Sequence, residues 1–259
     1  MALARYDWYA PSLKLHTPVV VLDPSDVGGG ESNTEHPLRL LYLFHGMSNN
    51  SSAWLRRSLV ERYVEGRNIV VVMPDLGRSY GANEVGGLPY WDYLRYDMPL
   101  FARQLLRLNV APQHTGVAGL SMGGYAAMRL ALAAPESFAV AGSFSGTLHV
   151  AARWQELERG EHRRVFGADE PLEGTEVDLL ARWRQLDDVQ RLPHLYVSCG
   201  TADPLYRHNQ DFVNVAQQAG VGDKLTAYYG PGAHDWEFWD AQLLAFLNWW
   251  DSQEAAPQP

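Results

Sequence analysis

The most informative six residues of this chain are Gly119-Leu120-Ser121-Met122-Gly123-Gly124. An apolar run at Thr115–Leu120 leads into the serine, and an alanine-rich stretch at Gly123–Ala134 follows it. A G-x-S-x-G pattern between a strand and a helix is typical of a nucleophile elbow. The turn is so tight that the positions two before and two after the serine tolerate almost no side chain. The pattern therefore predicts a strained turn that exposes Ser121 at the edge of a sheet.

A second serine stands in a similar setting but lacks the full pattern. Ser145 lies in Gly142-Ser143-Phe144-Ser145-Gly146, where a serine rather than a glycine comes two positions before it. We therefore interpret Ser145 as a structural residue at the end of a strand.

Outward from this turn, short apolar runs alternate with stretches of helical character. The first 35 residues indicate one or two antiparallel strands, of which Leu15–Leu22 is the clearest. Buried parallel strands are predicted at Leu38–Phe44, Asn68–Met73, Thr115–Leu120, Phe138–Phe144, Leu195–Cys199 and Leu225–Tyr229. Helices are predicted at Ser52–Glu65, Tyr90–Leu108, Gly123–Ala134, Asp211–Ala219 and Asp235–Trp250. This alternation predicts an α/β fold with a mostly parallel, doubly wound sheet and helices on both faces.

One segment, residues 148–192, interrupts the alternation. It is dense in Arg, Glu and Trp and has helical patterns around Gly160 and Gly174. It is either an insertion that caps one end of the sheet or an ordinary pair of surface helices. The length suits one large domain, so we expect a single domain over residues 1–259, with 148–192 as a candidate cap.

A nucleophilic serine needs a base to remove its proton, and the base needs a carboxylate to orient it. In this architecture the chain order is serine, acid, histidine, each placed just after the carboxyl end of a strand. Asp203 follows the run Leu195–Cys199, and His234 follows Leu225–Tyr229. We therefore predict Ser121, Asp203 and His234 as the catalytic residues.

Other acids and histidines fit these positions less well. Asp75 follows a strand that comes too early in the chain, and Asp235 adjoins His234, which makes a productive hydrogen bond awkward. The remaining candidates precede a strand or lie on a predicted helix: Asp187, Asp188, His114, His194 and His208.

A tetrahedral acyl intermediate needs two backbone N–H donors for its oxyanion. One is expected from Met122, the residue after the serine. The other is expected from Met47, in the loop that follows an early strand. His45, in the same loop, is a candidate second base, although a His-Gly pair at the end of a strand favours a structural role.

Aromatic side chains are candidates for the walls of a substrate pocket. Trp54 and Trp236 are the strongest candidates, because Trp54 is near the predicted oxyanion loop in the sequence and Trp236 is near His234. Bulky walls favour short acyl groups. Trp239, Trp249 and Trp250 fall on the last predicted helix, where they indicate core packing or an interface, and an exposed Trp-rich helix would fit a homo-oligomer.

Composition excludes several classes of protein. The chain has 21 Lys and Arg against 30 Asp and Glu, a net charge of −9 without a cationic cluster, so we expect no nucleic-acid partner. Cys199 is the only cysteine, which excludes an intramolecular disulfide framework, and the nine histidines lack paired spacing. We therefore expect neither a metal nor another cofactor. No apolar run is long enough to span a membrane and no signal peptide is recognisable, so we expect a cytoplasmic protein without membrane contact.

Four motifs, in this order, resemble the esterase D branch of the α/β-hydrolases: FHGM at 44–47, GLSMGG at 119–124, GTADPLY at 200–206 and GAHDWEFW at 232–239. That branch includes S-formylglutathione hydrolases, bacterial tributyrin esterases, many feruloyl esterases and the antigen 85 mycolyltransferases. The resemblance covers roughly residues 5–250. Within the branch, the chain is most similar to the tributyrin esterase group, through Tyr42–Asn50, Trp54-Leu55 and Val71–Asp75.

The resemblance implies the α/β-hydrolase fold, with Ser121 as nucleophile, Asp203 as acid, His234 as base, and Met47 and Met122 as oxyanion donors. S-formylglutathione hydrolases usually carry Leu-Thr-Cys where Met-Ser-Asn stands at 47–49 here, which argues against a glutathione thioester.

These observations together predict a serine carboxylesterase that hydrolyses short-chain acyl esters through an acyl-enzyme. The alternatives are an S-formylglutathione hydrolase or feruloyl esterase of the same branch, and an acyltransferase in which an alcohol replaces water. A non-catalytic binding protein on the same fold is disfavoured by the intact Ser–Asp–His order.

Overall fold

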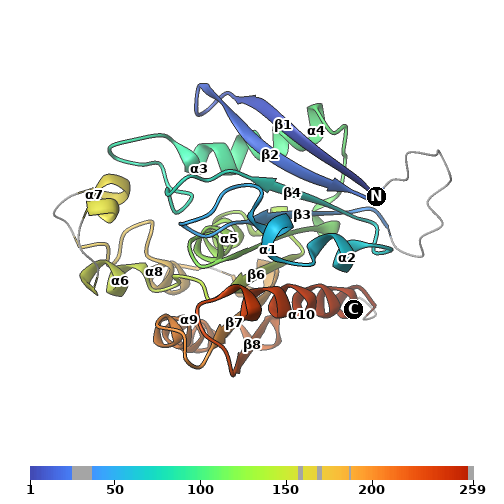
Figure 1. Ribbon diagram of the computed structural model, residues 1–259. Coiled ribbons are helices and arrows are strands. Elements are labelled where there is room, and N and C mark those ends of the chain that lie inside the picture. The colour runs from blue at the N-terminus through green and yellow to red at the C-terminus, as the bar shows by residue number, and fades with distance from the viewer. Residues whose placement is uncertain (25–36, 157–159, 168–170, 187, 256–259) are drawn as a thin grey trace.

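The computed structural model describes residues 1–24, 37–156, 160–167, 171–186 and 188–255. In this part of the chain, strands β1 to β8 form one sheet in the order β1-β2-β4-β3-β5-β6-β7-β8 (Figure 1). β2 pairs antiparallel with β1 and with β4, and the remaining pairs are parallel. The strands are β1 (Ala2–Ala10), β2 (Leu15–Asp23), β3 (Arg39–Phe44), β4 (Ile69–Pro74), β5 (Thr115–Leu120), β6 (Val140–Phe144), β7 (His194–Gly200) and β8 (Leu225–Gly230). The predicted mostly parallel α/β sheet is confirmed.

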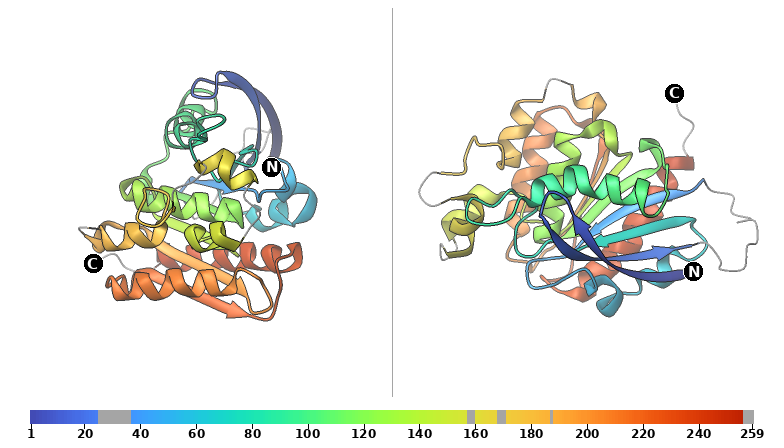
Figure 2. Two further views of the ribbon diagram at one scale, coloured as in Figure 1. Left: turned by 90° about the vertical axis from the view of Figure 1, so that its left-hand side faces the viewer. Right: turned by 90° about the horizontal axis from the view of Figure 1, so that it is seen from above.

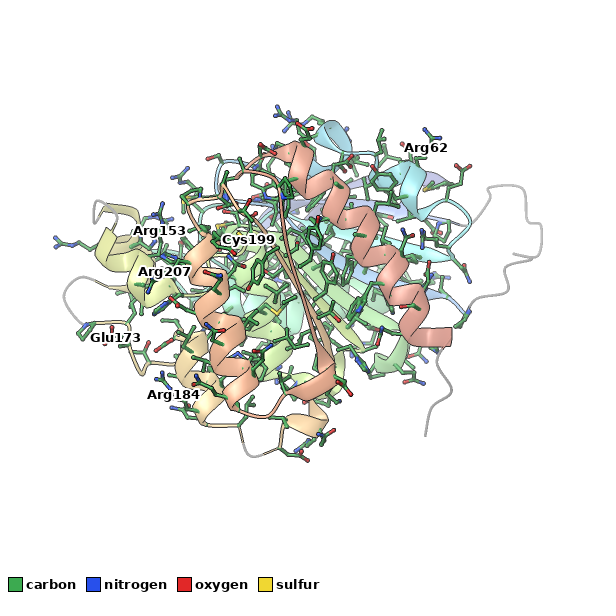
Figure 3. The ribbon with its side chains drawn as sticks, turned by 90° about the horizontal axis from the view of Figure 1, so that it is seen from below. Arg62, Arg153, Glu173, Arg184, Cys199 and Arg207 are labelled. Carbon is green, nitrogen blue, oxygen red and sulfur yellow. The ribbon has the colours of Figure 1, made fainter. Side chains whose placement is uncertain are left out.

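Helices cover both faces of this sheet. One core lies between the sheet and α4 (Met98–Gln104), α5 (Met122–Ala133), α8 (Leu179–Arg184) and α9 (Tyr206–Gln218). The other lies under α1 (Ala53–Arg57), α2 (Val60–Val64) and α10 (Trp236–Ala255). Seen from the β8 edge, α9 and α10 flank the sheet on opposite sides (Figure 3). On β3, Leu40 and Tyr42 face the first core, whereas Leu41 and Leu43 face the second. Burial on both sides explains why the strands appear in the sequence as continuous apolar runs.

Several helices differ from their predicted limits. The helix predicted at 52–65 is broken into α1 and α2, because Ser58 has extended backbone (φ −135°, ψ 172°) and the next residue, Leu59, donates its N–H to Asp240. The helix predicted at 90–108 consists of α3 (Tyr90–Asp92), a wider π-helical turn η1 (Tyr93–Asp97) and α4. Pro99 follows that turn; its ring crowds the carbonyl four residues earlier and it lacks an N–H, which favours a widened turn there. α9 begins five residues earlier than predicted, at Tyr206.

The tryptophans of α10 pack inward. Trp250 is fully buried and Trp239 nearly so, and Trp249 is half-buried with its indole N–H donating to Thr226 Oγ1 at 3.1 Å. The guanidinium of the buried Arg39 lies over the Trp250 ring and bonds Asp251, which fixes the carboxyl-terminal half of the helix to the start of β3. Of the two alternatives given for these tryptophans, core packing is the one that the structure shows. A homo-oligomer stays a prediction.

The segment 148–192 contributes α6 (Val150–Glu156), α7 (Gly160–Phe166) and α8. α7 lies apart from the layers around the sheet (Figures 1 and 2). It is attached to the loop after β4: Val85 and Gly86 donate their N–H groups to Val165 and Arg164, both at 3.0 Å. Arg164 also pairs with the buried carboxylate of Glu84. Whether this segment acts as a cap stays a prediction.

None of the helices in the described part of the chain is both long and apolar enough to cross a membrane.

We expect Gly142→Ala to destabilise the fold. A Cβ at this position of β6 would lie 2.9 Å from the Phe246 ring of α10 and 3.1 Å from the Ala118 Cβ of β5. Overpacking of this kind costs about 1–3 kcal/mol of unfolding free energy, which urea denaturation would measure. Gly160→Ala is the matched control, because a Cβ there meets nothing within 4 Å. Equal stability of the two variants would contradict the close packing of α10 on the sheet.

Candidate active site

Ser121 occupies a strained turn between β5 and α5. Its backbone (φ 53°, ψ −117°) lies in a region that residues with a side chain rarely adopt. The turn is held by its neighbours: the Ser121 N–H donates to the Phe144 carbonyl at 2.9 Å, and the Ser121 carbonyl accepts from Thr147 at 3.2 Å. These hydrogen bonds therefore hold Ser121 in its strained conformation.

The glycines around Ser121 are required by close contact between backbones. A Cβ on Gly119 would lie 2.5 Å from the carbonyl group of Gly123. A Cβ on Gly123 would lie 2.5 Å from the His45 carbonyl oxygen and 2.7 Å from that of Phe44. The first glycine lets α5 turn back over β5, and the second lets the loop after β3 approach the serine.

The structure brings Ser121, His234 and Asp203 into one chain of hydrogen bonds. His234 Nε2 lies 3.0 Å from Ser121 Oγ. His234 Nδ1 lies 2.9 Å from Asp203 Oδ2 and 3.1 Å from Oδ1. Because a carboxylate only accepts, Nδ1 carries the proton and Nε2 is left as an acceptor toward the serine hydroxyl.

The loops that carry the acid and the histidine are bound to each other. The Thr201 N–H donates to the Gly230 carbonyl at 2.8 Å, and the Ala202 N–H donates to the Gly232 carbonyl at 3.0 Å. A Cβ on Gly200 would collide with the Gly232 carbonyl. The distance between the two side chains is thus set by backbone contacts, which are stiffer than side-chain rotamers.

Asp203 is held as a carboxylate although its side chain is fully buried. Burial alone would raise its pKa. The hydrogen bond and charge of His234, together with the Leu205 N–H at 2.8 Å, outweigh burial and lower the pKa of this carboxyl. The acid therefore remains ionised and fixed in orientation at neutral pH.

The predicted oxyanion loop, residues 45–49 after β3, lies directly beside the serine. A Cβ on Gly46 would lie 3.5 Å from Ser121 Cβ, which places the next residue, Met47, beside the nucleophile. Asn49 closes the loop by donating its N–H to Gly46 at 3.1 Å. Met122 begins α5, and a first-turn N–H has no partner within its own helix.

His45 is buried, and both of its ring nitrogens form hydrogen bonds. Nδ1 lies 2.7 Å from the Gly46 carbonyl oxygen, to which it must donate. Nε2 accepts from the Leu76 N–H at 2.9 Å, so the ring is neutral and ties the oxyanion loop to the loop after β4. Burial lowers the pKa of His45, and the Gly46 hydrogen bond and the Asp75 carboxylate only partly offset this. These contacts describe a structural residue rather than a second base.

The other acids, histidines and the second serine considered from the sequence have different contacts or positions. Asp75 accepts from the backbone of Ser51 and Gly77, and Asp235 caps α10 by accepting from Phe238 at 3.0 Å. Ser145 is fully buried just after β6. Its N–H donates to the Ser198 carbonyl at 2.7 Å, and its side chain helps to lower the pKa of Asp203, so it supports the acid and is not a second nucleophile. The other rivals lie before or on elements as predicted: His114 precedes β5, Asp188 precedes β7, His194 begins β7 and His208 lies on α9, while Asp187 lies outside the described residues.

Trp54 and Trp236 differ in what they can contact. Trp54 has no exposed surface, and its indole N–H donates to the Phe44 carbonyl at 3.1 Å. It therefore supports the oxyanion loop from behind and does not line a pocket, contrary to the prediction. Trp236 is half-buried, packs edge-on against Trp54 and lies under the Arg57 guanidinium. It keeps a surface that a ligand can touch.

Two contacts at the site were missed from the sequence. Trp239, assigned only to packing or an interface, lies edge-on against the His234 ring with centroids 4.9 Å apart. Trp239 lies on the first turn of α10, only five residues after His234, and this short separation is the signal that could have revealed the contact. Arg78 Nη2 lies 3.2 Å from Met47 Sδ, and no local pattern indicates that contact.

No group of three or more His, Cys, Asp or Glu side chains among the described residues is arranged to hold a metal ion.

The chain is similar to known esterases and serine hydrolases. The family model described as "Putative esterase" matches residues 10–250. An acetyl esterase from Caldicellulosiruptor saccharolyticus is 26% identical, over 96% of this chain and 98% of that protein. The fluorophosphonate-binding serine hydrolase FphF of Staphylococcus aureus has a TM-score of 0.85 at 28% identity, covering 96% of this chain and 98% of that one. The S-formylglutathione hydrolase FrmB of the same organism has a TM-score of 0.81 at 28% identity, covering 96% and 99%. The predicted α/β-hydrolase fold is confirmed.

We expect the neutral form of His45 to contribute a pH-dependent part of the stability. Because its pKa is lowered in the folded state, the unfolded chain binds this proton more readily. The contribution is complete above the unfolded pKa of about 6.5 and is lost as the pH falls toward the folded pKa. Between pH 6.5 and 5, the unfolding free energy of wild type should therefore fall more steeply than that of His45→Gln, by at most about 1.4 kcal/mol per pH unit.

Urea denaturation at several pH values measures these slopes. His16→Gln, at an exposed position on β2, controls for the loss of an imidazole as such. Parallel pH profiles for wild type and His45→Gln would contradict a buried neutral His45.

Proposed function

Because the chain belongs to the esterase family, we propose that it is a serine carboxylesterase that hydrolyses short-chain acyl esters through Ser121, His234 and Asp203. The observation that carries this proposal is the continuous chain of hydrogen bonds from Ser121 Oγ through His234 to the buried Asp203 carboxylate.

In the first step, Ser121 Oγ attacks the ester carbonyl carbon while His234 Nε2 takes the hydroxyl proton. The 3.0 Å separation of these two atoms supports direct transfer. The Nδ1 proton stays on His234, and Asp203 stabilises the imidazolium that forms. Asp203 is already ionised and is held by the Leu205 N–H, so it does not have to reorient when the imidazolium forms.

The negative charge that develops on the carbonyl oxygen is stabilised by the N–H groups of Met47 and Met122. Each such donor is worth about 10²–10³ in kcat. Placement of the oxyanion loop depends on His45, which binds its own loop to the one after β4.

The tetrahedral intermediate then collapses. The imidazolium gives its proton to the leaving alkoxide, the alcohol departs, and the acyl group remains on Ser121. A water molecule repeats the sequence with His234 as base, which releases the carboxylic acid and restores the serine hydroxyl. The sum is one ester and one water converted to one acid and one alcohol.

We assign short acyl groups, of the kind that tributyrin-type esterases take, on two grounds. The similar protein from Caldicellulosiruptor saccharolyticus is named an acetyl esterase. Bulky Trp236 retains exposed surface on the first turn of α10, two residues after the base, where it can limit the length of an acyl chain. The segment 148–192, attached through α7, is a candidate cap for the alcohol side.

A thioesterase acting on S-formylglutathione is the second candidate. The similarity to FrmB over nearly the whole of both chains favours it. The same residues would act, with a thiolate in place of an alkoxide as leaving group. Met47-Ser48-Asn49 in the predicted oxyanion loop, where S-formylglutathione hydrolases usually carry Leu-Thr-Cys, argues for the carboxylesterase.

We expect wild type to hydrolyse p-nitrophenyl acetate and butyrate well, octanoate and ferulate poorly. Ser121→Ala should lose at least about 10³-fold in kcat, because the chain then lacks a nucleophile. Release of p-nitrophenolate measures both. Ser252→Ala, which removes an exposed hydroxyl near the end of α10, is the control and should keep the full activity.

Undiminished ester hydrolysis by Ser121→Ala would contradict the nucleophile assignment. Faster hydrolysis of octanoate than of acetate would contradict the short-chain assignment while leaving the triad intact.

The two candidate substrates can be separated directly. We expect kcat/KM on S-formylglutathione to be at least about tenfold below that on p-nitrophenyl acetate, a difference of about 1.4 kcal/mol in transition-state binding. Loss of thioester absorbance measures the first rate, and the glutathione-free thioester S-formyl-mercaptoethanol is the matched control. A preference for S-formylglutathione over both other substrates would favour the second candidate instead.

A further inference from the structure

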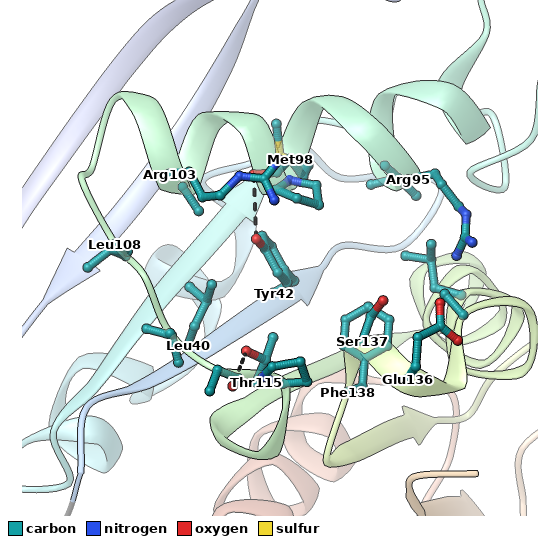
Figure 4. A pocket seen from close by; sticks show the side chains of 18 of the residues that line it. Leu40, Tyr42, Arg95, Met98, Arg103, Leu108, Thr115, Glu136, Ser137 and Phe138 are labelled. Carbon is teal, nitrogen blue, oxygen red and sulfur yellow. Dashed lines mark hydrogen bonds between the residues drawn. The ribbon is translucent and has the colours of Figure 1, made fainter. Parts of the chain in front are cut away.

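A cavity of about 580 Å³ lies between α4 and the sheet, beside β3. Its lining runs along β3 from Leu40 to Phe44 and includes Thr115 at the start of β5; Leu40, Tyr42 and Thr115 are labelled in Figure 4. None of Ser121, Asp203 and His234 lines it, so the cavity is distinct from the candidate active site. The volume falls in the range of about 300–1,000 Å³ that small-molecule sites occupy.

The walls of this cavity are mainly apolar. They comprise Leu40, Leu94, Met98, Leu108, Leu130 and Phe138. A polar molecule would lose its hydration here without replacement, whereas a hydrocarbon chain would gain about 25 cal/mol for each Å² of apolar surface removed from water. The interior therefore suits an alkyl chain.

Two guanidinium groups stand at the rim, although the chain as a whole is acidic. Arg103 projects from α4 over Tyr42, and Arg95 extends toward the side on which Glu136 lies (Figure 4). Glu136, of opposite charge to Arg95, lines the same side of the cavity. Arg103 is thus the cation above the apolar part of the cavity, and a guanidinium matches the geometry of a carboxylate.

Tyr42 supplies a second polar group at the same place. Its side chain is buried, and its hydroxyl lies 3.4 Å from the Met98 carbonyl oxygen, longer than a good O–H···O bond. Burial raises the pKa of Tyr42, and the nearby charge of Arg103 opposes that rise. The Tyr42 hydroxyl can therefore exchange its weak hydrogen bond to the Met98 carbonyl for one to a ligand oxygen that also contacts Arg103.

We propose that this cavity binds a medium-chain carboxylate, with the alkyl chain among the apolar walls and the carboxylate between Arg103 and the Tyr42 hydroxyl. Neither the nucleophile nor the esterase activity enters this argument, so the proposal stands apart from the proposed function.

Titration calorimetry with sodium octanoate below its micelle concentration tests the proposal. We expect saturable binding of octanoate, at least about tenfold weaker binding of 1-octanol, and none of acetate, which lacks the chain. Arg103→Gln should weaken octanoate about tenfold, as loss of a charge-assisted hydrogen bond does. Arg107→Gln is the matched control, because Arg107 is exposed one turn further along the chain and does not line the cavity.

A second pair of variants separates this cavity from the candidate active site. Ala111→Trp, at the cavity wall in the loop before β5, should abolish octanoate binding by filling the space, and circular dichroism would check that it folds. Ser121→Ala should bind octanoate as wild type does. Equal affinity for octanoate and octanol, retention of binding in both Arg103→Gln and Ala111→Trp, or no saturable binding to wild type would each overturn the proposal.

Discussion

Close contact between backbones around Ser121 is the constraint on which the rest of this structure depends. A Cβ on Gly119 or Gly123 would meet backbone atoms at 2.5 Å, and a Cβ on Gly46 would meet the Leu120 side chain at the same distance. The absence of side chains at these glycines lets three segments pack closely: the end of β5, the start of α5 and the loop after β3. The serine is thereby held with positive φ beside the oxyanion loop. A glycine pair at 200 and 232 does the same for the acid and histidine loops.

Burial and charge then act on residues that the backbone has already placed. Asp203 is buried yet ionised, because His234 and the Leu205 N–H outweigh its desolvation. His45 is buried and neutral, because its ring accepts from Leu76 and donates to Gly46. The charged Asp203 orients His234, and the neutral His45 holds the predicted oxyanion loop in place. Both depend on partners from loops that follow different strands.

The candidate active site and the apolar cavity occupy separate places on the sheet. The carboxyl ends of β5, β7 and β8 lead into Ser121 and the loops that bear Asp203 and His234, where parallel strands bring loops from distant parts of the chain together. An apolar cavity with Arg103 in its wall lies along β3 and the start of β5, on the α4 side of the sheet. None of the three catalytic residues lines this cavity, so a ligand there need not contact them.

The sequence by itself determined the strands, the elbow and the order of Ser121, Asp203 and His234, because each depends on local patterns: apolar runs, a glycine spacing and positions after strands. Only the tertiary structure decided what long-range packing controls. The helix breaks at Ser58, and Asp240 supports the break by accepting from the Leu59 N–H, 181 residues away along the chain. Trp54 is buried behind the predicted oxyanion loop, and Trp239 touches His234. Whether an aromatic side chain lines a pocket or fills a core depends on what packs against it, and that information is not local.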